Sequence, residues 1–249
     1  MKKKNKAIIS LILAVFIATG GYVGNMFGVF SNGNYGEYSL NKSEALNSPI
    51  NGKRIIFLGS SVTFGYGSLG VSFVEFLEKE DGIIPLKEAV SGTTLADLKS
   101  NSYVSRLKTV DKSFKADAFI CQLSTNDATK NIPLGKISTS FARECFDTLT
   151  VAGATEYIIS YVREVFGCPV IFYTQARYDS EPYEKMVSLL YEIKDKWDIE
   201  IIDLWNNEEV NGITAEKRKL YLVDNIHPTK AGYKDWWLSH FRQTLYKLL

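Results

Sequence analysis

The strongest constraint on the fold is an alternation of short apolar runs with amphipathic stretches, which begins at Lys53 and continues to the C-terminus. Short apolar runs suit buried strands, while apolar residues spaced three and four apart favour helices. The expected strands are 54–60, 85–92, 118–124, 169–175 and 199–205, and the expected helices are 71–80, 95–110, 153–167, 181–197 and 229–249. The pattern therefore predicts an α/β fold, a three-layer α/β/α sandwich whose five-stranded parallel sheet is covered on both faces.

The N-terminal region differs from the rest of the chain. Its basic start, MKKKNK, precedes an uncharged apolar run over 7–24, the pattern of a secretory signal or a membrane anchor. We therefore expect 1–30 to be a signal peptide or N-terminal membrane anchor, which makes the protein extracellular, either secreted or held at the cell membrane. The Asn- and Ser-rich segment 31–51 is expected to be a tether, and 52–249 to be the single folded domain.

Composition argues against several function classes. The formal net charge is +1 and part of the positive charge lies in the N-terminal lysine cluster, so nothing indicates a nucleic-acid partner. The chain has three cysteines without a CxxC pair and only two histidines, which favours neither a disulfide framework nor a metal site. We expect no cofactor and no metal, and a membrane partner only through the N-terminal segment; the oligomeric state stays open.

The residues directly after the expected strands carry the candidate chemistry, because ligands of parallel α/β sheets bind beyond the carboxyl ends of the strands. Ser61 follows the first strand, at a turn that Gly59 permits, and His227 lies just before the last helix. Asp224 precedes His227 by three residues, so one tight turn can place its carboxylate beside Nδ1. A nucleophilic hydroxyl, a base and an orienting carboxylate form the catalytic triad of a serine hydrolase.

Two further strand ends offer hydrogen-bond donors for a developing oxyanion. Asn126 ends the third strand, and its side-chain amide can donate. Gly92 follows the second strand, and its backbone N–H is accessible because no side chain blocks the approach. Each candidate residue also has an ordinary structural interpretation, as a turn or cap residue, but all of them fall in order at successive strand ends.

These stretches together resemble the sequence blocks of the SGNH hydrolase family, also called GDSL-like lipases and esterases. FLGSSVTFG looks like the first block, with Ser61 at the nucleophile position, and AVSG looks like the second, with Gly92. STND resembles the third block, with Asn126, and DNIHP resembles the last, with Asp224 and His227. The resemblance runs from residue 53 to the C-terminus, and further stretches look like a bacterial branch of the family that supplies no substrate.

The resemblance implies a flavodoxin-like sandwich and a metal-independent serine esterase that forms an acyl-enzyme on Ser61. It also implies an oxyanion hole made of the backbone N–H groups of Ser61 and Gly92 and the amide of Asn126. Two positions depart from the family pattern: Ser60 stands where Asp is usual, and Ser124 where Gly is usual. We expect Ser60 to change how the nucleophile turn is held, and Ser124 to narrow the floor of the site.

The expected substrate is a small-molecule or glycan ester, including O-acetyl groups on extracellular carbohydrate. An O-acyltransferase with the same triad, or a non-catalytic carbohydrate-binding protein on this scaffold, are the alternatives that the sequence leaves open. Aromatic residues could stack on sugars, although packing is the favoured interpretation for them. They are Tyr173, Tyr178, Tyr183, Trp236 and Trp237.

Two other patterns compete with this interpretation. Residues 65–70 match GxGxxG, the glycine pattern of dinucleotide-binding folds, and Glu88 lies at a plausible distance for a ribose contact. The first glycine of such a fold follows its strand directly, whereas five residues intervene here. Asp203 is an alternative orienting acid, although a role in supporting a neighbouring loop is favoured, and His240 is expected on a helix face away from the chemistry.

Overall fold

The computed structural model of the chain describes residues 21, 24 and 26–249. The predicted signal or anchor falls largely on residues 1–20, 22–23 and 25, which lie outside the described residues. No helix among the described residues is both long and apolar enough to cross a membrane.

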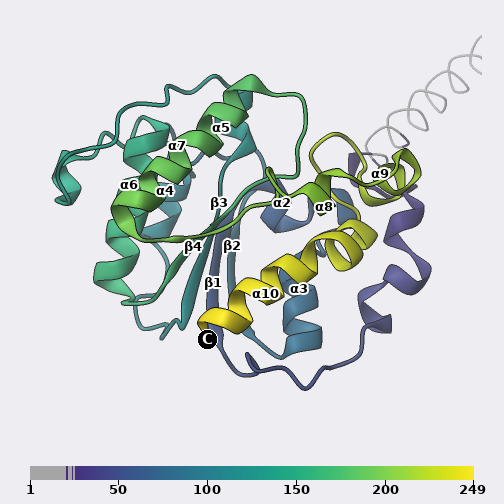
Figure 1. Ribbon diagram of the computed structural model, residues 1–249. Coiled ribbons are helices and arrows are strands. Elements are labelled where there is room, and N and C mark those ends of the chain that lie inside the picture. The colour runs from purple at the N-terminus through teal and green to yellow at the C-terminus, as the bar shows by residue number, and fades with distance from the viewer. Residues whose placement is uncertain (1–20, 22–23, 25) are drawn as a thin grey trace, which may run out of the picture.

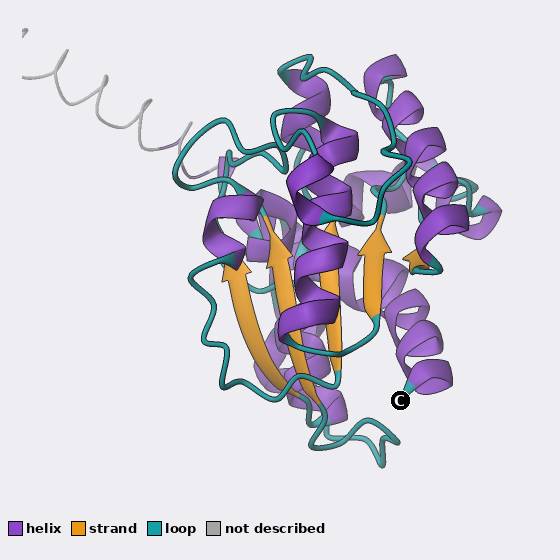
Figure 2. Ribbon diagram, turned by 90° about the vertical axis from the view of Figure 1, so that its left-hand side faces the viewer, coloured by secondary structure: helices purple, strands orange, loops and turns teal. Residues whose placement is uncertain are grey.

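A five-stranded parallel sheet forms the centre of the molecule (Figures 1 and 2). The strands lie in the order β2-β1-β3-β4-β5, and every neighbouring pair is parallel. Their bounds are β1 Arg54–Gly59, β2 Ile84–Ala89, β3 Ala118–Gln122, β4 Val170–Tyr173 and β5 Glu200–Ile202. The predicted fold class is therefore confirmed, and the strands are shorter at their ends than the apolar runs.

Helices cover both faces of the sheet. One face packs against α4 Tyr103–Leu107, α6 Val151–Val165 and α7 Glu181–Trp197. The other face packs against α3 Phe73–Phe76, which continues as a helical turn over Leu77–Asp81, and against the C-terminal α10 Leu238–Leu248 (Figure 1). Successive β1 residues alternate between the two cores, Ile56 on the first face and Phe57 on the second, because side chains of a strand point to opposite faces.

Short helices follow the strands at the carboxyl edge of the sheet. They are α2 Ser61–Phe64, α5 Thr125–Thr129, α8 Glu208–Asn211 and α9 Ala215–Tyr221. The predicted helix 181–197 agrees with α7, whose N-terminus is capped by the side chain of Ser180. The last predicted helix begins with a wider turn over Gly232–Trp237 and then continues as α10.

The predicted helix over 95–110 is largely wrong, because only Tyr103–Leu107 is helical. The buried carboxylate of Asp127 accepts the backbone N–H groups of Leu95 and Ala96, at 2.7 and 3.0 Å, and fixes this stretch as a loop. The helix begins only after Ser102, whose hydroxyl caps the N–H of Ser105. Apolar spacing alone did not reveal this competing carboxylate.

Segment 31–51, the expected tether, lies against the domain in three short turns, Asn32–Asn34, Gly36–Tyr38 and Leu40–Lys42. The buried side chain of Asn34 donates to the carbonyl of Gly67 and accepts from the N–H of Lys230. Ile50 is fully buried in the core of the α3 face. The segment therefore makes specific contacts with the folded part of the chain.

Candidate active site

Ser61 is the first residue of α2 and directly follows the β1–α2 turn. Gly59 is required for this turn, since a Cβ at that position would lie 1.8 Å from Oγ1 of Thr63. The N–H of Ser61 is one of the donors that a helix leaves free in its first turn, and it forms no hydrogen bond among the described residues. The nucleophile candidate thus sits at a fixed turn with a free donor beside its hydroxyl.

The three predicted triad residues lie in hydrogen-bond contact. The Oγ of Ser61 and the Nε2 of His227 are 2.8 Å apart. The Nδ1 of His227 lies 2.7 Å from Oδ2 of Asp224. This geometry leaves Nε2 to accept the serine proton while Nδ1–H donates to the carboxylate.

Asp224 is held by its own loop. Its Oδ1 accepts the backbone N–H groups of Ile226 and His227, both at 2.7 Å. Burial alone would raise the pKa of this carboxyl, but the hydrogen bond and charge of His227 and the two N–H groups lower it below the usual value. Asp224 is therefore a carboxylate in the neutral pH range, as an orienting acid must be.

The glycines of the GxGxxG stretch have a structural explanation in the active-site loop. Gly65 and Gly70 have φ of +87° and +83°, a region that favours glycine. At Gly67 a Cβ would lie 3.0 Å from Cβ of His227 and 2.7 Å from a methyl of Val223. The loop after α2 therefore packs directly against the loop that holds His227.

We expect Gly67→Ala to lower kcat/KM by about a hundredfold, because the added methyl must displace His227 from the hydroxyl it contacts. Ester hydrolysis by the purified variant measures this loss. Gly70→Ala is the matched control: its positive φ strains the backbone, but nothing lies within 4 Å of the added methyl. Equal losses of activity in the two variants would contradict the steric explanation.

The candidate oxyanion donors lie around the same turn. The amide nitrogen of Asn126 donates to the carbonyl of Thr93 at 3.0 Å and to Oγ of Ser60 at 3.2 Å. Gly92 adopts a φ of +79°, and its N–H makes no hydrogen bond within the described part of the chain. Both hydrogens of the Asn126 amide are thus engaged. To bind an oxyanion, the amide must give up one of these two hydrogen bonds. The bond to Ser60 is the longer and weaker of the two, so it is the one to break.

Ser60 has a defined role in place of the family's usual Asp. Its N–H donates to Oε1 of Gln122 at 2.9 Å, and its Oγ accepts from Asn126. The turn is therefore held without a charged side chain at position 60. Ser124 is fully buried between β3 and α5, and its expected effect on the floor of the site stays a prediction.

Gln122 is a positioning residue that the sequence analysis missed. Its Oε1 accepts the N–H groups of Ser60 and Thr63, at 2.9 and 3.3 Å, and the hydroxyl of Thr63 at 3.0 Å. The sequence signal for this role was a glutamine in an otherwise apolar strand, because a buried polar side chain forms hydrogen bonds with other parts of the protein. Gln122 thus ties the start of α2 to β3.

We expect Gln122→Leu to reduce stability by about 1–3 kcal/mol, because it leaves buried donors of Ser60 and Thr63 without their acceptor. Activity should fall with it, since the turn that orients Ser61 loses its anchor. Thermal unfolding and kcat together measure the effect. Gln122→Glu keeps an acceptor oxygen at this position, so an activity no better than that of Gln122→Leu would contradict the proposed role.

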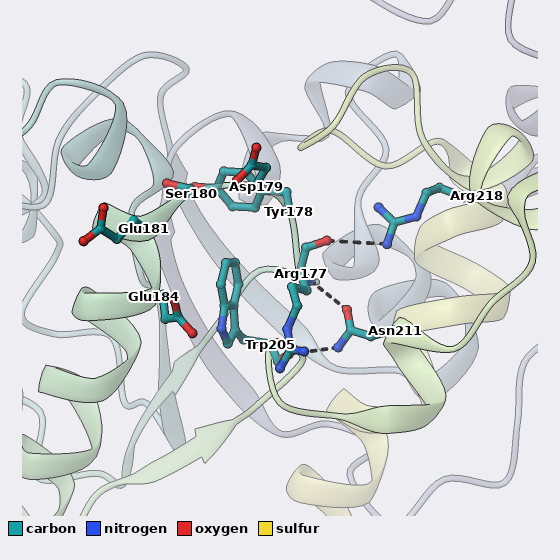
Figure 3. A pocket seen from close by; sticks show the side chains of 9 residues that line it. All are labelled: Arg177, Tyr178, Asp179, Ser180, Glu181, Glu184, Trp205, Asn211 and Arg218. Carbon is teal, nitrogen blue, oxygen red and sulfur yellow. Dashed lines mark hydrogen bonds between the residues drawn. The ribbon is translucent and has the colours of Figure 1, made fainter.

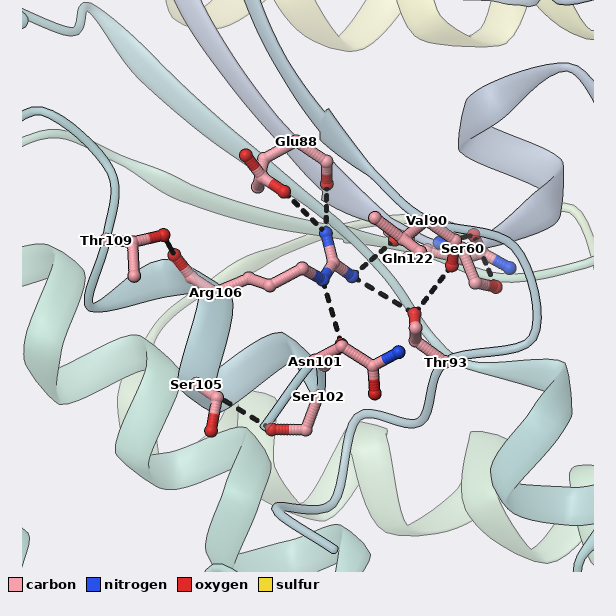
Figure 4. Close-up of polar contacts among 11 residues, drawn as sticks. Ser60, Glu88, Val90, Thr93, Asn101, Ser102, Ser105, Arg106, Thr109 and Gln122 are labelled. Carbon is pink, nitrogen blue, oxygen red and sulfur yellow. Dashed lines mark hydrogen bonds and ion pairs between the residues drawn. The ribbon is translucent and has the colours of Figure 1, made fainter. Parts of the chain in front are cut away.

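A buried arginine joins the strand ends on the other side of the turn (Figure 4). Arg106 donates to the carbonyls of Gly59 and Glu88, the ends of β1 and β2, at 2.7 and 2.8 Å. It also donates to the hydroxyl of Thr93 and forms an ion pair of 3.1 Å with the Glu88 carboxylate. The carboxylate of Glu88, the residue considered for a ribose contact, is thus paired with the guanidinium group of Arg106.

The remaining candidates lie away from the triad contact. Asp203 accepts from Thr174, Tyr191 and the N–H of Trp205, which agrees with support of a loop. His240 lies in α10 and approaches the side chain of Asn207. Neither residue hydrogen-bonds His227 or Ser61.

The aromatic residues considered for sugar stacking serve mainly in the core. Four of them are buried, namely Tyr173, Tyr183, Trp236 and Trp237. Tyr178 is half-buried and lines a groove of about 670 Å³ beyond β4 and β5 (Figure 3). Charged groups surround this groove, including Arg177, Arg218, Asp179 and Glu181.

The chain segment that lines the groove is linked to the histidine loop through Gln175. Gln175, two residues before Arg177, donates from its amide to the carbonyl of Ile226, the neighbour of His227. Arg218 in turn donates to the carbonyl of Arg177. The groove therefore lies on the same edge of the sheet as the triad contact.

The sheet order, the two helical layers and the serine–histidine contact at the carboxyl edge are those of an SGNH-type hydrolase. The chain belongs to the GDSL-like lipase/acylhydrolase family, whose model matches residues 57–234, more than half of the chain. The resemblance stated from the sequence is thereby confirmed. A comparison with curated proteins found no match.

Solved structures share the fold at low identity. A protein from Lactobacillus plantarum is 16% identical with a TM-score of 0.64, over 79% of this chain and 96% of that one. A protein from Bacteroides ovatus, described as a GDSL-like lipase, is 16% identical with a TM-score of 0.57, over 79% and 99%. A family two carbohydrate esterase from Clostridium thermocellum, solved with cellohexaose, is 16% identical with a TM-score of 0.57, over 81% and 66%.

Proposed function

We propose that this hydrolase is a serine esterase that works through an acyl-enzyme on Ser61. The observation that carries the proposal is the continuous contact from Oγ of Ser61 to Nε2 of His227, at 2.8 Å, and from Nδ1 to Asp224, at 2.7 Å. In the first step Oγ attacks the ester carbonyl while Nε2 takes its proton. Asp224 stabilises the imidazolium, which then protonates the departing alcohol.

The tetrahedral oxyanion would be held by the backbone N–H groups of Ser61 and Gly92 and by the amide of Asn126. Loss of one such donor typically raises the barrier by about 3 kcal/mol. In the second step a water gives a proton to His227 and attacks the acyl carbonyl. The bond between the acyl carbon and Oγ then breaks, His227 returns the proton to Oγ, and the free acid leaves. The chemistry needs no metal in this scheme, since the protein donors polarise the carbonyl.

We propose esters on carbohydrate, O-acetyl groups among them, as the substrate class. The groove beyond β4 and β5 supports this proposal, because its mixture of carboxylates, guanidinium groups and two aromatic side chains, Tyr178 and Trp205, suits a sugar. The carbohydrate esterase from Clostridium thermocellum, solved with cellohexaose, adds a precedent on the same fold. The basic start and apolar run of the sequence support an extracellular site of action, and the mass of the exported protein tests whether the run is removed.

A fluorophosphonate probe followed by mass mapping of the labelled peptide tests the nucleophile. We expect labelling of the peptide that contains Ser61, and hydrolysis of short acyl esters in a parallel panel. Labelling confined to another serine would overturn the assignment. Transfer of acetyl to an added glycan in preference to water would instead indicate an O-acyltransferase with the same triad, and absence of both labelling and turnover would favour a carbohydrate-binding role.

A further inference from the structure

Exposed apolar side chains gather in the segment that follows the apolar run of the sequence. Met26, Phe27, Val29 and Phe30 are all exposed, and Phe30 is the most exposed large apolar residue of the described chain, at 65%. Leu69, in the loop after α2, is exposed as well. A single exposed apolar residue is common on protein surfaces, but four within five positions indicate an interaction surface.

This segment is docked on the domain rather than trailing from it. The side chain of Asn34 donates to the carbonyls of Gly28 and Gly67, at 2.8 and 2.9 Å. Gly28 has a φ of +73°, and a Cβ there would lie 2.1 Å from the carbonyl oxygen of Gly67. Residues 26–34 therefore have a defined position beside the loop that follows α2.

The same contacts bring the segment to the active site. The ring of Phe27 lies 4.7 Å from the ring of Tyr66, and Tyr66 lies 5.1 Å from the imidazole of His227, measured between ring centroids. Tyr66 and Leu69 belong to one turn of the loop after α2. The exposed apolar residues thus border the face on which the serine and histidine meet.

One lysine, Lys219, and one glutamate, Glu216, lie beside the apolar side chains. Phe30 and Lys219 line the same shallow hollow between the N-terminal segment and α9. Lys219 belongs to α9, whose sequence is AEKRKLY, and it is exposed. Exposed apolar and aromatic side chains with a lysine at their border are found on surfaces that lie on bilayers.

We propose that Met26, Phe27, Val29, Phe30 and Leu69, with Lys219 of α9, form a bilayer-contact surface that holds the catalytic face against a phospholipid membrane. The occupant is a lipid bilayer because the uncharged apolar run over 7–24 ends two residues before Met26, so a bilayer that receives the run must lie at the surface. Esters presented at the membrane are then the ones in reach of Ser61, a consequence that rests on the proposed esterase function.

The test uses the full chain reconstituted in vesicles of phosphatidylglycerol and phosphatidylcholine. A Cys145→Ser background removes the one exposed cysteine and leaves the buried Cys121 and Cys168. Phe30→Cys then carries an environment-sensitive fluorophore, and lipids spin-labelled near the headgroup act as quenchers. Phe141→Cys is the matched control, since Phe141 is 59% exposed and lies in the loop before α6.

We expect lipid quenching at position 30 at least about twice that at position 141, since a residue at headgroup depth is within reach of the spin label. Equal quenching at both positions would overturn the proposal. Shielding of position 30 that depends on protein concentration and occurs without lipid would also overturn it, because the occupant would then be a second copy of the chain.

Activity gives a second, separable readout. Phe30→Ser should lower hydrolysis of an ester carried on a vesicle-anchored lipid severalfold and leave hydrolysis of a soluble short-chain ester unchanged. An equal loss on both substrates would contradict the bilayer-contact role. If the wild-type protein hydrolyses neither ester, the esterase proposal fails, while the quenching result still decides where the surface lies.

Discussion

Ser61→Ala is expected to lower kcat by roughly 10⁴- to 10⁶-fold, the size of loss found when a triad nucleophile is removed. The variant keeps its binding groups, so KM for an ester should change little. Its fold should persist as well, because only one part-buried hydrogen bond is lost, the 2.8 Å contact from Ser61 Oγ to His227 Nε2. The measurement is single-turnover hydrolysis of an activated ester, with thermal unfolding of the same preparation.

Ser60→Ala provides the matched control for Ser61→Ala. It removes a neighbouring hydroxyl that accepts from Asn126 but leaves the attacking oxygen in place, so we expect a loss within about tenfold, the range of one neutral hydrogen bond. A residual activity of Ser61→Ala near that of Ser60→Ala would show that another residue is the nucleophile.

His227→Gln is expected to have an effect of the same order, about 10⁴-fold or more in kcat, because no other described base lies within hydrogen-bond distance of Ser61 Oγ. Asp224→Asn should be milder, roughly 10³- to 10⁴-fold, since it leaves the base but disturbs its tautomer and orientation. Kinetics of the two variants with one ester substrate measure both losses.

The double variant His227→Gln/Asp224→Asn tests whether His227 and Asp224 act together, as in a triad, or contribute independently to kcat. Since Asp224 acts only through His227 in this mechanism, we expect the double variant to be no slower than His227→Gln alone. Multiplied losses would contradict that dependence. His240→Gln, which changes the other histidine of the chain, serves as the control and should retain its activity.

The layers and the strand ends were predictable from the sequence because each depends on local patterns. Parallel buried strands read as uninterrupted apolar runs, and the carboxyl ends of such strands meet at one edge. The positions of Ser61, Asn126 and His227 therefore followed from the pattern once the strands were placed. Their joint resemblance to a family then indicated the roles.

What escaped prediction depends on contacts between distant residues. The loop conformation at Leu95 is set by the Asp127 carboxylate, 32 positions away, which no local window contains. The amide of Gln122 and the guanidinium of Arg106 hold the nucleophile turn and the strand ends from β3 and α4. Helical spacing gave a correct α7 because that helix is specified by its own apolar face and its cap.

Ser61 and His227 are 166 residues apart in the sequence, and this separation determines when during synthesis the protein can become catalytically active. Polypeptides are made from the N-terminus, and domains fold as units, so the nucleophile emerges long before its base exists. A nascent chain therefore carries an inert hydroxyl. Acyl transfer, on the proposed mechanism, begins only when the final helix has closed the domain, so turnover itself reports that maturation is complete.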